Sequence, residues 1–101
     1  PNVCSWPAED PTPDRAGDMP HLPAPAAQEP PIELGDIALA LGVITREAAE
    51  AEKSLDHHLS HLMVHGLLHL LGFDHIHDAD AALMEGLETR ILARLGIADP
   101  Y

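Results

Sequence analysis

The histidine-rich stretch from His57 to His77 constrains this chain more than any other part of its sequence. It contains seven of the eight histidines of a 101-residue chain. Three of them, His65, His69 and His75, follow the spacing H-x-x-x-H-x-x-G-x-x-H, in which Gly72 is the glycine. Residues four apart in an α-helix lie one above the other, so a helix would place the first two imidazoles on one face. The spacing therefore predicts two neighbouring metal-binding side chains.

Gly72 predicts how the third histidine reaches the same ion. Glycine adopts a left-handed backbone conformation at low cost and commonly ends a helix there. The resulting turn would bring His75 back toward His65 and His69. Three neutral imidazoles at about 2.0–2.1 Å hold zinc and leave the fourth tetrahedral position to water, as in catalytic sites. The spacing thus predicts one Zn²⁺ per chain on these three side chains.

The other histidines of the stretch have a simpler interpretation. His57, His58, His61 and His77 are expected on a solvated face or in a tract that binds metal loosely. His61 lies on the same helical stripe as His65, because positions four apart advance by only about 40° around the helix. It could therefore line the pocket without touching the metal.

Gly66 occupies the position that holds the general-base glutamate of zinc peptidases, which disfavours an ordinary peptidase mechanism. Glycine inside a helix costs about 1 kcal/mol relative to alanine, so a side chain here is expected to obstruct something. Two readings remain open. Either a bulky substrate approaches the metal here, or another element packs closely against the helix.

Charge and cysteine content limit the partners and the compartment. Seventeen acidic against five basic residues give a formal net charge of −12. Such a chain repels nucleic acid at long range, so binding would have to be local, metal-assisted or helped by residues outside this chain. Cys4 is the only cysteine, which fits a reducing compartment. Without a long apolar run or a signal sequence, the chain is expected to be cytoplasmic and free of the membrane.

The length of 101 residues predicts one domain over residues 1–101, in which two strands precede three helices. Strands are expected at Val3–Trp6 and at about 36–41. Residues 7–31 hold eight of the ten prolines and are expected to form a flexible loop, in which His21 is solvated.

Three helices are expected in the second half. The first would begin at a Thr45 N-cap, and the second, capped by Asp56, would run to about Leu71 as the central, histidine-bearing helix. The last would run from 78–80 to Gly96. Their apolar positions are expected to form the core: Leu59, Leu62, Met63, Leu67, Leu70, Leu83, Met84, Leu87, Ile91, Leu92 and Leu95.

The run HGLLHLLGFDH, preceded by HLMV, resembles the signature of the YbeY family of bacterial endoribonucleases. The opening PNVCSWP is similar to that family's T-N-V-L-S-F-P segment, and LGDIALA is similar to its L-G-D-I strand. The resemblance covers nearly all of the chain except the proline-rich loop. Family members carry further N-terminal sequence, with a strand, a helix and an arginine, so this chain is expected to be incomplete at its N-terminus.

The resemblance implies zinc on His65, His69 and His75 in an α+β fold with a small mixed β-sheet packed against helices. It implies a single-strand-specific endoribonuclease of rRNA maturation, acting in 16S rRNA 3′-end processing and in ribosome quality control. Its partners would be single-stranded RNA, the ribosome and ribosomal proteins.

The expected mechanism is hydrolysis by a metal-activated water, with no side-chain nucleophile. Asp74 is a candidate to orient a histidine, although it could equally cap a turn. Two alternatives remain. One is a zinc peptidase-like hydrolase, and the other is an inactive zinc-stabilised fragment that binds a ribosomal partner.

Overall fold

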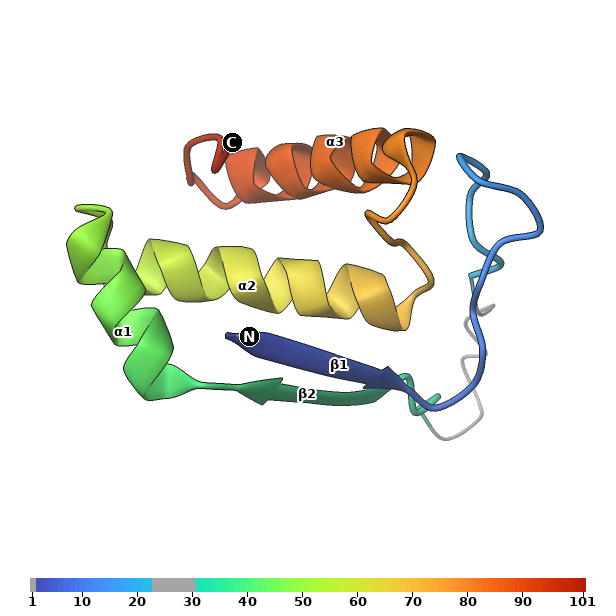
Figure 1. Ribbon diagram of the computed structural model, residues 1–101, viewed down its shortest axis with the longest axis horizontal. Helices are drawn as coiled ribbons and strands as arrows, with labels where there is room; N and C mark the ends of the chain where they lie inside the picture. The colour runs from blue at the N-terminus through green and yellow to red at the C-terminus, as the bar shows by residue number, and fades with distance from the viewer. Residues whose placement is uncertain (1, 23–30) are drawn as a thin grey trace.

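The structure, a computed structural model, describes residues 2–22 and 31–101. Two strands are followed by three helices, in the order β1 (Val3–Pro7), β2 (Gly35–Leu39), α1 (Leu41–Glu50), α2 (Leu55–Leu70) and α3 (Asp78–Arg94). The helix α2 lies in the middle, with the strands on one side and α3 on the other (Figure 1). The predicted α+β fold with a central histidine-bearing helix is confirmed.

The two strands pair antiparallel, with Val3 opposite Leu39 and Pro7 opposite Gly35. Both predicted strands are therefore present, with their ends shifted by one or two residues. Gly35 has a φ of +141°, and a Cβ there would overlap the Trp6 carbonyl oxygen, so this close approach requires glycine. Within the described residues the sheet consists of these two antiparallel strands, which differs from the predicted mixed sheet.

The first two helices begin at other residues than predicted. Thr45 is not an N-cap, because α1 already begins at Leu41 and the Thr45 hydroxyl donates to the Leu41 carbonyl oxygen at 2.8 Å. Ser54, and not Asp56, caps α2, and its hydroxyl accepts a hydrogen bond from the His57 backbone N–H at 3.1 Å. Asp56 lies in the first turn, where its negative charge still complements the helix dipole.

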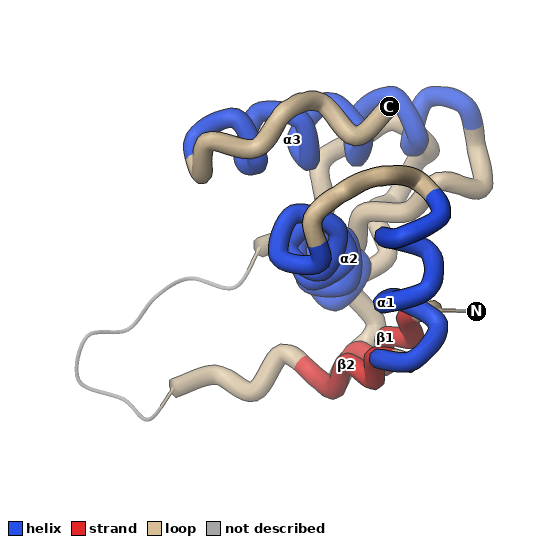
Figure 2. The backbone as a smooth tube through the Cα atoms, turned by 90° about the vertical axis from the view of Figure 1, so that its left-hand side faces the viewer, coloured by secondary structure: helices blue, strands red, loops and turns tan. Residues whose placement is uncertain are grey.

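The core forms where α2 and α3 meet. Leu68, Phe73 and Met84 make one buried cluster, and α3 ends near Gly96 as predicted. Other predicted core positions are also buried, namely Leu62, Leu70 and Leu92. Partly buried side chains pack around the cluster: Val64, Leu71, Leu83, Leu87 and Ile91. Figure 2 looks almost along α2 and shows α3 above it and the strands below.

Three predicted core positions are wrong. Met63, Leu67 and Leu95 are 45%, 42% and 62% exposed. The helix α2 is apolar around most of its circumference, but α1, α3 and the two strands contact only part of it. In such a helix, hydrophobic periodicity does not distinguish the covered side from the exposed side.

The segment after β1 contacts the end of α2 and the start of α3. The Gly17 backbone N–H donates to Asp80 Oδ1 at 2.6 Å, and Pro20 is buried. The flexible loop expected over 7–31 stays a prediction, and its part at 23–30 lies outside the described residues. No helix of the described chain is both long and apolar enough to span a bilayer.

Candidate metal centre

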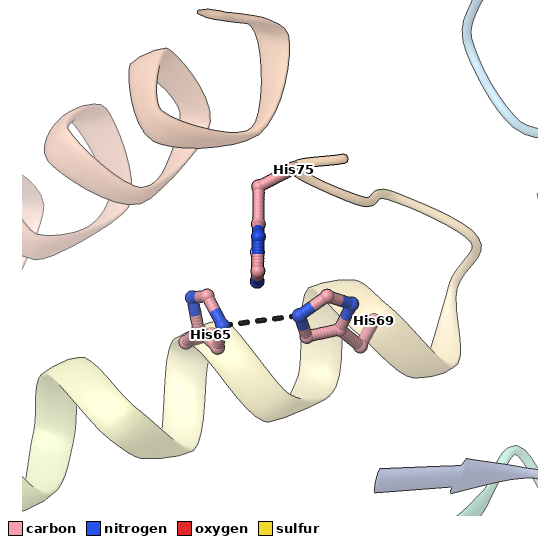
Figure 3. Close-up of side chains that lie close together, drawn as sticks. All are labelled: His65, His69 and His75. Carbon is pink, nitrogen blue, oxygen red and sulfur yellow. Dashed lines mark hydrogen bonds between the residues drawn. The ribbon is translucent and has the colours of Figure 1, made fainter. Parts of the chain in front are cut away.

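The helix α2 and the turn after it bring the three predicted ligands together. Nε2 of His65 and Nε2 of His69 lie 3.0 Å apart. The ring centroid of His75 lies 5.3 Å from that of His65 and 5.0 Å from that of His69. One nitrogen from each ring lies within 4.8 Å of the other two. Figure 3 shows the His75 ring directed into the space between its two neighbours.

Gly72 forms the turn as the spacing predicts. Its φ is +106°, in the region that glycine tolerates best. Its backbone N–H donates to the His69 carbonyl at 3.1 Å, and that of Phe73 donates to the Leu68 carbonyl at 3.0 Å. This pair of bonds is the Schellman pattern that closes a helix C-terminus. The chain thereby reverses and carries His75 back over the last turns of α2.

A carboxylate of α3 lies directly behind His65. Glu88 is fully buried, and its Oε1 accepts a hydrogen bond from His65 Nδ1 at 2.8 Å. Its Oε2 accepts from His61 Nε2 at 2.9 Å and from the Tyr101 hydroxyl at 2.6 Å. Burial alone would raise the pKa of Glu88, but the three hydrogen bonds outweigh it and lower the pKa to about 2. Glu88 is therefore a carboxylate at neutral pH.

Glu88 is not among the site residues predicted from the sequence, although the sequence contains a signal for it. Met84, Glu88 and Leu92 are four residues apart on α3, and all three are fully buried. An acidic residue in the apolar stripe of a helix is expected to have strong hydrogen-bond partners. The sequence could have marked Glu88 as unusual, but it could not have named the partners.

The hydrogen bond to Glu88 determines which nitrogen of His65 is free. A carboxylate can only accept, so His65 must carry its proton on Nδ1, which leaves the Nε2 lone pair facing His69. His69 Nε2 faces His65 Nε2 at 3.0 Å. Desolvation by burial, followed by the nearby charge of His65, lowers the pKa of His69 and favours its neutral form.

This donor set fits a metal ion. His65 Nε2 and His69 Nε2 are within hydrogen-bond distance at 3.0 Å, so His69 can donate an Nε2 proton to the free lone pair of His65 in the metal-free chain, and a cation could take the place of that proton. Ligand nitrogens of tetrahedral zinc, at about 2.0–2.1 Å from the ion, are about 3.3 Å apart. The separation of His65 Nε2 and His69 Nε2 is close to that value, and His75 is near enough to complete the set. Metal binding by the three residues itself stays a prediction.

Asp74 lies beside the site without orienting a ligand through a hydrogen bond. Its Oδ1 is 3.9 Å from His69 Nδ1, which allows electrostatic attraction but is too long for a hydrogen bond. The same oxygen accepts from the His75 backbone N–H at 2.7 Å. These contacts favour the turn-capping reading of Asp74.

The triad opens into a cleft of about 1120 Å³ between β1, the segment 8–16 and the α2–α3 turn. Arg15 is the one arginine or lysine among the described residues that line it. The acidic lining residues are Glu9, Asp10, Asp14, Asp74 and Asp80. A phosphate entering this cleft would therefore meet mostly negative protein charge, and a bound divalent cation would offset it.

Gly66 serves close packing. A Cβ there would lie 3.2 Å from Ile37 Cδ1 and 3.2 Å from Ser5 Oγ, both of the sheet. The Ser5 hydroxyl also donates to the Gly66 carbonyl oxygen at 3.2 Å. Of the two readings of this glycine, the structure supports the approach of another element and not room for a substrate.

Two histidines expected on a solvated face are held by carboxylates. His58 Nε2 lies 3.3 Å from Glu47 Oε1 of α1. His61 pairs with Glu88 and does not line the cleft of the triad. Neither partner could be identified from spacing, because each lies on a different helix. His57 and His77 are exposed, as expected.

The sequence matches a family model described as Endoribonuclease YbeY over residues 1–96. Three relatives named Endoribonuclease YbeY align with 99% of this chain. They come from Jannaschia sp. (strain CCS1) at 63% identity, Dinoroseobacter shibae at 62% and Ruegeria pomeroyi at 57%. The chain spans 59%, 55% and 60% of their respective lengths.

The family match covers β1, β2 and all three helices, including the triad, its turn and Glu88. It agrees with the resemblance found in the histidine motif and in the two strand segments. The chain belongs to the YbeY family.

Proposed function

We propose that this protein is a zinc-dependent endoribonuclease, with His65, His69 and His75 as the ligands of one Zn²⁺. The observation that carries the proposal is the convergence of three imidazole nitrogens within 4.8 Å of one another at the wall of an open cleft. A set of three protein ligands leaves the fourth position of zinc open, as catalysis requires. The names of the relatives supply the reaction class.

Zinc held by these three residues would supply a Lewis acid and would lower the pKa of water, so that hydroxide is available as the nucleophile for a phosphodiester near neutral pH. The protein residues have separate roles. Glu88 orients His65, the turn at Gly72 places His75 beside the other two ligands, and the RNA strand binds in the cleft. Glu88 itself cannot be the general base, because it is fully buried and already accepts three hydrogen bonds.

The substrate we propose is single-stranded RNA, in particular the 3′ end of 16S rRNA. We propose that the protein acts in the cytoplasm with ribosomal proteins as partners, and that it contributes to ribosome quality control. The cleft supports a local, metal-assisted mode of binding, because its lining is acidic and long-range attraction is absent. A peptidase is less well supported. Gly66 has no carboxylate, and strand residues occupy the space beside it.

The test is His69→Ala, with His57→Ala as the matched control, since His57 is an exposed histidine of the same helix outside the triad. Zinc content is measured by elemental analysis and cleavage by assay on single-stranded RNA, with a peptide substrate alongside. We expect His69→Ala to lose both zinc and RNA cleavage, and His57→Ala to keep both.

RNA cleavage that survives the loss of zinc in His69→Ala would refute the proposal. Cleavage of peptide and not RNA would favour the peptidase. One zinc per chain with neither activity would favour the inactive fragment.

A further inference from the structure

The buried carboxylate of Glu88 joins three parts of the chain at one point. It lies on α3 and is 0% exposed. It accepts hydrogen bonds from His61 and His65 of α2 and from Tyr101 beyond the end of α3. Burying a carboxylate costs free energy unless hydrogen-bond donors or an opposite charge compensate for the lost water. Three donors at 2.6–2.9 Å meet that need.

This arrangement restricts His65 to one of the two tautomers that a neutral imidazole can adopt. A free histidine can carry its proton on either ring nitrogen. Here Glu88 Oε1 can only accept, so the proton of His65 must be on Nδ1. The Nε2 lone pair is then directed at His69 Nε2, 3.0 Å away, where the ion of the proposed site would bind.

Tyr101 and His61 fix the orientation of the Glu88 carboxylate. Both donate to Oε2, which leaves Oε1 for His65 alone. The rings of Tyr101 and His61 also pack edge to face, with centroids 5.6 Å apart. The tyrosine thereby links the segment after α3 to the geometry of the triad.

We propose that Glu88 is a positioning residue, which holds His65 in the tautomer with the proton on Nδ1 so that Nε2 is available to the metal. Tyr101 supports it through Oε2. The inference rests on the proposed metal site but not on the substrate.

A second metal ion on His61, His65 and Glu88 is the competing interpretation, since these three groups also lie within 4.8 Å of one another. It is less favoured, because it would replace the two hydrogen bonds from the histidines to Glu88 and, with the triad also occupied, would remove the single ring N–H proton of neutral His65.

The direct test is the tautomer of His65 in the metal-free, unmutated chain, read from long-range ¹H–¹⁵N NMR correlations. We expect the proton on Nδ1. In Glu88→Gln, only one oxygen remains to accept, and we expect a mixture of tautomers. Zinc affinity, measured by competition with a chelator, should fall by about 10–100-fold. Tyr101→Phe should weaken zinc binding by at most about 10-fold, since it removes one of three hydrogen bonds.

Glu85→Gln is the matched control, because it makes the same charge change on α3 and Glu85 has no hydrogen bond to a histidine in the described chain. It should leave the tautomer and the zinc affinity unchanged. A proton on Nε2 of His65 in the unmutated chain would overturn the inference. So would zinc affinity in Glu88→Gln equal to that of the control, or a second zinc equivalent lost in His61→Ala. A chain that binds zinc as expected but cleaves no RNA would contradict the proposed function alone.

Discussion

Gly72→Ala tests whether the turn after α2 has the geometry that delivers the third histidine. An alanine at a φ of +106° costs about 1–3 kcal/mol in backbone strain. Its Cβ would also lie 2.8 Å from Pro20 Cβ and would overlap the Pro11 carbonyl oxygen. Crowding of this kind adds about 1–3 kcal/mol. We therefore expect the free energy of unfolding to fall by about 2–6 kcal/mol.

Gly96→Ala is the matched control for backbone strain. Gly96 also has a positive φ, of +79°, but a Cβ there meets no atom within 4 Å. It should cost only about 1–2 kcal/mol. Urea denaturation of the metal-free variants gives both values, and chelator competition gives their zinc affinities. We expect zinc binding to weaken only in Gly72→Ala, because His75 follows that turn.

Equal destabilisation in Gly72→Ala and Gly96→Ala would refute the packing of residues 11–20 against the turn. Unchanged zinc affinity in a folded Gly72→Ala chain would refute the link between the turn and the metal site.

Gly66→Ala should change the free energy of unfolding by less than about 1 kcal/mol, because contacts of the new Cβ at 3.2 Å with Ile37 and Ser5 offset the gain in helix propensity. Urea denaturation measures this change, and a loss of several kcal/mol would contradict the prediction. Gly86→Ala, with open space around its Cβ in α3, should stabilise the chain by about 0.5–1 kcal/mol, and any loss in the same assay would contradict this. The pKa of Glu88 falls from 4.5 to about 2 on folding, so its stabilisation is complete above pH 4.5 and is lost as the pH falls toward 2. The lost stabilisation amounts to about 3 kcal/mol and should be visible in denaturation measured between pH 5 and 2. The pH dependence of the free energy of unfolding should be smaller in Glu88→Gln, and an unchanged pH dependence in that variant would contradict the prediction.

The triad could be predicted from the sequence because its geometry is local. His65 and His69 are one helical turn apart, and Gly72 determines the reversal that follows. These relations depend only on the helix repeat and on the conformational freedom of glycine. The same holds for α3, whose start and end were correctly placed.

The groups behind the triad could not be predicted, because they depend on how helices pack. Glu88 reaches His65 only because α3 lies on α2, and the two residues are 23 positions apart. The pairing of His58 with Glu47 likewise depends on how α1 meets α2. The exposure of Met63 and Leu67 has the same origin, since it depends on which side of α2 is covered.

The errors at helix starts have a local cause. The apolar run before Thr45 fits a continued strand as well as a first helical turn, and the structure uses it as helix. Ser54 and Asp56 are both good capping residues, two positions apart. The serine is the one that precedes the first helical turn.

The central claim is that three imidazoles hold one zinc ion. X-ray absorption at the zinc edge tests it directly in the zinc-loaded chain and in His75→Ala. For the unmutated chain we expect three imidazole nitrogens at about 2.0–2.1 Å and one further light atom. His75→Ala should retain two imidazoles. An equal number of imidazoles in both samples, or a sulfur ligand from Cys4, would contradict the claim.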